Sequence, residues 1–109
     1  MDNFILRIGP LDIDVVFCPL NEEFFGDFCY IKNKIRIEES LSGPPLVDTL
    51  IHEVNHAVWK VGQLCNKKQG EERAVSVMAS TWTQIYRDNP WLLDWIAKHL
   101  ELSKKKNGK

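Results

Sequence analysis

The segment from Leu50 to Val58 constrains the fold more than any other part of the chain, because it combines a His-Glu-x-x-His motif with an amphipathic helical pattern. Residues four apart lie one turn apart on an α-helix, so the imidazoles of His52 and His56 project from the same face. Both side chains can then bind one zinc ion, with Glu53 beside them as a base for a water molecule. The simpler alternative is a solvated helix face that binds no metal.

The same segment predicts a helix over 44–61 that needs packing partners. Eight apolar side chains share one broad face of this helix, namely Leu46, Val47, Leu50, Ile51, Val54, Ala57, Val58 and Val61. His52 and His56 fall on the opposite face together with Trp59. Because a tryptophan is costly to leave in water, we expect the next helix to cover the histidine face as well.

Composition indicates one ordinary globular domain. The 109 residues are 44% hydrophobic and 27% charged, which predicts a single domain over 1–103 and a basic flexible tail over 104–109. A net charge of -1 gives no electrostatic attraction to nucleic acid or membrane. No signal peptide or long apolar run is present, so we expect a cytoplasmic protein. The three cysteines lack C-x-x-C spacing, which favours reduced thiols.

The first third of the chain has the period-two pattern of short strands. Apolar residues alternate over 4–8 and 13–17, with Gly9-Pro10 at the turn between them. The segments 27–31 and 34–38 flank Lys32-Asn33, and Asn33 tolerates the positive φ of a tight hairpin. These patterns predict three or four short strands.

The segment 34–38 predicts an edge strand. Ile35 and Ile37 are expected to face the core, while Lys34 and Arg36 point outward with Glu38. Outward charges of this kind are typical of an exposed sheet edge.

Two further helices are predicted after the motif helix. The first covers 71–87 and the second covers 91–102, with Asn89 as the N-cap of the second and Pro90 at its first position. The expected fold is therefore α+β, with a small antiparallel or mixed sheet at the N-terminus packed on three helices.

A catalytic zinc site needs a third protein ligand. Glu71 and Glu72 open the second predicted helix, where a carboxylate is also favoured by the helix dipole. His99 is better explained as a surface histidine and Cys65 as an ordinary thiol. One of the two glutamates is the preferred third ligand.

These residues resemble the gluzincin metallopeptidases, in which a glutamate from the next helix completes a His-Glu-x-x-His site. The likeness is closest to the ImmA/IrrE-type metallopeptidases and to small single-domain proteins of this kind from phages and prophages. It is carried by residues 49–57 (TLIHEVNHA), 71–79 (EERAVSVMA) and 87–90 (RDNP). The resemblance implies a minimal zincin-like fold, a bound Zn²⁺ and hydrolysis of a peptide or protein substrate.

The resemblance also ranks the site residues. In such proteins a small polar or acidic residue follows the ligand glutamate by four positions and a small residue follows by seven, which favours Glu72 (Ser76, Ala79) over Glu71. Substrate would add as a strand along the predicted edge, at Lys34, Ile35, Arg36 and Ile37. Tyr30 and Tyr86 are guesses for a group that stabilises the oxyanion. The alternative function is a proteolytically inactive, zinc-stabilised interaction module of phage or prophage origin.

Overall fold

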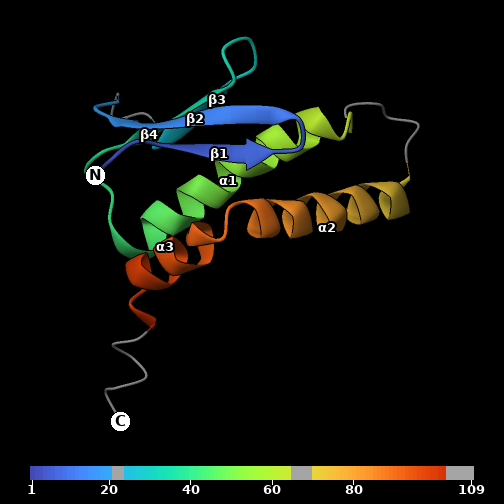
Figure 1. The fold of residues 1–109 in the computed structure, drawn as a ribbon. Coiled ribbons are helices and arrows are strands. Elements are labelled where there is room, and N and C mark those ends of the chain that lie inside the picture. The colour runs from blue at the N-terminus through green and yellow to red at the C-terminus, as the bar shows by residue number, and fades with distance from the viewer. Residues whose placement is uncertain (21–23, 65–69, 103–109) are drawn as a thin grey trace.

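The computed structural model describes residues 1–20, 24–64 and 70–102. A four-stranded sheet lies across α1, and α2 and α3 pack on the same side of the sheet as α1 (Figure 1), which confirms the expected α+β architecture. The elements in chain order are β1 (Phe4–Ile8), β2 (Leu11–Cys18), β3 (Gly26–Cys29), β4 (Lys34–Glu38), α1 (Gly43–Val61), α2 (Glu71–Asp88) and α3 (Trp91–His99). Within the described ranges no helix is long and apolar enough to cross a membrane.

The sheet is mixed, and its strand order is β1-β2-β4-β3. β4 pairs with β2 in parallel and with β3 in antiparallel orientation, so the prediction that 34–38 forms an edge strand is wrong. The reason is geometric: side chains leave a strand through the faces of the sheet, so alternating charges mark a solvated face and not an edge. The outward Arg36 binds Asp27 on β3, with 2.9 Å between Nε and Oδ1.

One face of the sheet and the apolar face of α1 form the core. The fully buried strand residues are Leu6, Ile8, Ile13, Val15, Ile35 and Ile37, and those of α1 include Leu46, Leu50, Val54, Ala57 and Val58. The apolar faces predicted for the strands and for the motif helix therefore pack against each other in a single core. Asn33 has the predicted positive φ, 50. The two-residue turn predicted between 27–31 and 34–38 is wrong, because β3 ends at Cys29 and residues 30–33 form the turn.

The third helix is shorter than predicted. α3 ends at His99, because Leu100 is its C-cap and Glu101 takes a left-handed φ of 56 that stops the helix. Cys18 and Cys29 are free, partly buried thiols. Cys65 and the predicted basic tail lie outside the described residues.

The outer edge of β1 is closed by polar side chains at the end of α2. Asn89 Oδ1 accepts the Arg7 N–H at 2.9 Å, and Asn89 Nδ2 donates to the Arg7 carbonyl at 2.9 Å. Gln84 adds hydrogen bonds to the Gly9 N–H and the Arg7 carbonyl. The prediction that Asn89 caps α3 is wrong, because the N-cap is Pro90 and the Asn89 side chain is buried against β1. The other edge of the sheet is β3.

Candidate functional site

The two motif histidines lie side by side in the middle of α1. Their ring centroids are 5.0 Å apart, and both side chains are exposed. The expectation that the second helix covers them is wrong. α2 instead packs along the neighbouring side of α1, where Trp82 Nε1 donates to Asn55 Oδ1 at 2.9 Å. α2 directs Trp82, Ile85 and Tyr86 to the core, and the histidine face stays open to solvent.

Glu53 differs from the histidines because β3 passes directly over it. Its side chain is buried, as is that of Thr49 one turn earlier. Burial raises the pKa of the Glu53 carboxyl above its usual value, an effect that the positive charge of His52 and His56 partly opposes. The fold therefore holds a carboxyl in a poorly hydrated position next to two solvent-accessible imidazoles.

Gly26 is what allows β3 to approach α1 so closely. A Cβ at this position would lie 2.9 Å from Thr49 Cγ2, 3.0 Å from the Arg36 carbonyl oxygen and 3.3 Å from Glu53 Cγ. Gly26 pairs with Ile37 in the sheet, so its missing side chain would point toward the helix, as Ile37 does. Gly26 therefore belongs to the site. Neither the His-Glu-x-x-His motif nor the helical period of the motif helix predicted this.

We expect Gly26→Ala to displace β3 from α1, because the backbone oxygen of Arg36 cannot move away as a flexible side chain could. The variant should lose roughly 1–3 kcal/mol of unfolding free energy, measured by chemical denaturation. Gly70→Ala is the matched control, since Gly70 has φ -76 and a Cβ added there would have no atom within 4 Å. Equal stability of the two variants would contradict the close contact described for Gly26.

Three hollows meet at His52 and together form one groove along α1. The first has a volume of about 260 Å³ and is lined by Phe24, Phe25, Gly26, Asp48, Thr49, His52 and Glu53. The central one has about 430 Å³ and is lined by Gly26, Asp27, Phe28, Tyr30, His52, Glu53 and His56. The last has about 340 Å³ and is lined by His52, Asn55, His56, Trp59 and Met78.

The two tyrosines that the sequence suggests for oxyanion stabilisation differ in their position relative to the groove. Tyr30 lines the central hollow with the three motif residues, and Lys60 Nζ donates to its backbone carbonyl at 2.6 Å. Tyr86 packs against Trp82 instead, with ring centroids 5.4 Å apart. Of the two, only Tyr30 lies on the groove.

Among the described residues, no third metal ligand is assembled with the two histidines. In the parts of the chain that the structure describes, no group of three or more His, Cys, Asp or Glu side chains could hold a metal ion. Glu71 and Glu72 begin α2 as predicted, and both are exposed. His99 packs against Trp95 in a tilted ring contact, with ring centroids 4.4 Å apart, and Cys65 lies outside the described residues. Among the described residues, the groove therefore brings together two imidazole donors and the Glu53 carboxyl.

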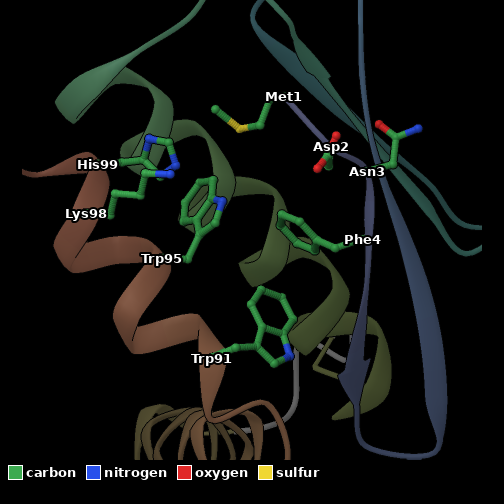
Figure 2. A pocket seen from close by; sticks show the side chains of 8 residues that line it. All are labelled: Met1, Asp2, Asn3, Phe4, Trp91, Trp95, Lys98 and His99. Carbon is green, nitrogen blue, oxygen red and sulfur yellow. The ribbon is translucent and has the colours of Figure 1, made fainter.

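A separate hollow of about 520 Å³ lies between α3 and the start of β1. Figure 2 shows Trp91 and Trp95 projecting from α3 toward Phe4, with Lys98 and His99 further along the helix. The ring centroids of Phe4 and Trp91 are 4.8 Å apart in an edge-to-face contact, which is typical of core packing. This hollow shares no lining residue with the groove at His52.

No protein family, curated protein sequence or solved structure matches this chain. The function must therefore be argued from the residues of the groove and their surroundings.

Proposed function

We propose that this chain is a zinc-dependent metallopeptidase in which His52 and His56 bind the metal and Glu53 is the general base. The observation that carries the proposal is the juxtaposition of two exposed imidazoles with a buried carboxyl, in a groove beside a sheet edge. Zinc supplies a Lewis acid that lowers the pKa of water and polarises a carbonyl group.

The carboxyl of Glu53 suits the role of a base. Because burial raises its pKa, the carboxylate holds a proton more tightly than an exposed glutamate would. Its place in the central hollow, between the two histidines and β3, lets it take a proton from water and pass it to a leaving amine.

The sheet offers a place for the substrate backbone on β3 and not on β4. β4 is paired on both sides, and the outer edge of β1 is closed by Asn89 and Gln84. The outer edge of β3 borders the central hollow, where an extended peptide can add as a further strand. The proposed binding strand thus moves from 34–38 to Gly26–Cys29.

The third ligand stays part of the proposal, with Glu72 preferred and Glu71 as the alternative. We expect the purified protein to contain about one equivalent of zinc, and His52→Ala or His56→Ala to weaken zinc binding by roughly 100-fold or more. Glu72→Ala should have a similar effect, whereas Glu71→Ala, its neighbour on the same exposed turn, should keep the metal. Metal analysis after dialysis would measure the zinc content of each variant, and zinc titration would measure its affinity.

The outcome assigns the ligand directly. Loss of zinc from Glu71→Ala but not from Glu72→Ala would transfer the role to Glu71. A wild-type protein that binds no zinc would overturn the proposed metal site.

The second candidate function is a protein-interaction module that is stabilised by zinc and cleaves nothing. It is favoured by one observation: large apolar side chains are exposed around the groove, with Phe25 58% and Trp59 41% exposed, as on a surface that another protein covers. The two candidates differ on whether Glu53 is needed for the biological activity.

A further inference from the structure

The groove at His52 ends in aromatic side chains on both sides. Phe24 and Phe25 line the end near the start of α1, and Trp59 lines the other end with Met78. Phe25 is 58% exposed and Trp59 is 41% exposed. Large apolar side chains that gather around a groove in this way mark a surface that another molecule covers.

The distance between the two ends suits a short extended peptide. Thr49 and Trp59 are ten residues apart on α1, which corresponds to about 15 Å along the helix axis. β3 runs beside this stretch, because Gly26 lies over Thr49 while the carbonyl of Tyr30 binds Lys60. An extended chain rises about 3.3 Å per residue, so four or five residues span the groove.

The charges in the middle of the groove do not select a charged side chain. Asp27 is the acidic residue that β3 contributes, and it forms an ion pair with Arg36 that also lowers the pKa of its carboxyl. Asp48 lies at the Phe24 end and, among the described residues that line the three hollows, is the one other carboxylate besides Glu53. Recognition of side chains is therefore dominated by the aromatic ends.

We propose that the groove binds an extended peptide segment with two large apolar side chains four positions apart, one on each side of the bond above Glu53. Residues four apart in an extended chain point to the same face and lie about 13 Å apart, which is close to the length of the groove. One side chain enters the hollow of Phe24 and Phe25, and the other enters the hollow of Trp59 and Met78. This inference rests on the proposed function for the cleavage of that bond, but the binding of the segment does not depend on cleavage.

Peptide binding can be measured without hydrolysis in the Glu53→Gln background, with and without zinc. The probes are two fluorescein-labelled peptides of about eight residues, identical except that one carries Leu and Phe four positions apart around its centre and the other carries Ser at both positions. We expect the apolar peptide to bind at least about 10-fold more tightly in fluorescence anisotropy. Trp59→Ala and Phe25→Ala should each weaken its binding by about 5- to 20-fold and leave the serine peptide unchanged.

Leu93→Ala is the matched control, because Leu93 is 53% exposed on α3 and lines none of the three hollows. Equal binding of the two peptides would overturn the inference, and so would a Leu93→Ala variant weakened as much as Trp59→Ala. Selective binding by a zinc-loaded wild-type protein that hydrolyses neither peptide would overturn the peptidase and support the groove. Hydrolysis of both peptides at equal rates would support the peptidase and overturn the selective binding of apolar side chains in the groove.

Discussion

Glu53→Gln should reduce hydrolysis of an unfolded protein such as casein by roughly 10²–10⁴-fold, because Gln keeps the shape of the side chain but cannot accept the proton. Zinc content should be unchanged, since the proposed ligands are His52, His56 and a glutamate of α2. Hydrolysis would be measured as the release of fluorescent fragments from labelled casein by the zinc-loaded protein. The zinc content of the same samples would be measured by metal analysis.

The variant should also fold at least as well as the metal-free wild type. Burial raises the pKa of Glu53 in the folded state, so the charged carboxylate destabilises the fold at pH values above that raised pKa. Gln removes this cost at neutral pH, and the advantage should vanish as the pH falls below the usual pKa of glutamate, where the carboxyl is protonated in both states. Denaturation at several pH values would show this trend.

Glu39→Gln is the matched control, because Glu39 is exposed and lines none of the three hollows. Hydrolysis by Glu53→Gln at the wild-type rate would remove Glu53 from the role of base. A zinc-loaded wild-type protein that cleaves nothing, together with an unchanged biological activity in Glu53→Gln, would establish the interaction module instead.

Local sequence patterns predicted the type and order of the secondary-structure elements, but not all of their bounds, because β3 is Gly26–Cys29 where 27–31 was predicted and α3 ends at His99. The alternation over 4–8 and 34–38 gave strands with those bounds, and the helical period around His52 gave α1 to within one residue. These predictions succeeded because each depends on which side chains an element must bury. Strand order failed, because the charges beside Ile35 and Ile37 show which face is solvated and carry no information about the neighbouring strand.

The site was predictable only where it is local in sequence. His52, Glu53 and His56 share one helix, so their spacing alone brought them together. The burial of Glu53 depends on Gly26, which is 27 positions earlier; the only local signal is a glycine where the alternation with Phe28 calls for a side chain facing α1. The prediction that the second helix covers the histidines failed, because α2 packs along the Asn55 side of α1.

Asn89→Ala should have the largest effect on stability. The side chain is only 3% exposed and makes three hydrogen bonds, two to the backbone of Arg7 and one from Nδ2 to the Ile85 carbonyl at 2.8 Å. Alanine would remove all three hydrogen bonds and would leave the Arg7 N–H without a partner, whereas the Arg7 carbonyl keeps Gln84 Nε2 and the Ile85 carbonyl keeps the backbone N–H of residue 89. We expect a loss of about 2–4 kcal/mol of unfolding free energy, and a fall in Tm of roughly 10–20 °C, measured by circular dichroism.

The same substitution should change how the sheet meets other molecules. Asn89 closes the outer edge of β1 together with Gln84, so the loss of its side chain exposes part of a second strand edge in addition to β3. Asn89→Ala should therefore self-associate in sedimentation velocity at concentrations where the wild type does not. Thr83→Ala is the control, since the Thr83 hydroxyl donates to the Ala79 carbonyl within its own helix. A monomeric Asn89→Ala variant that unfolds within about 2 °C of wild type would mean that water replaces the amide, and the closed edge would then depend on Gln84 and the packing of α2.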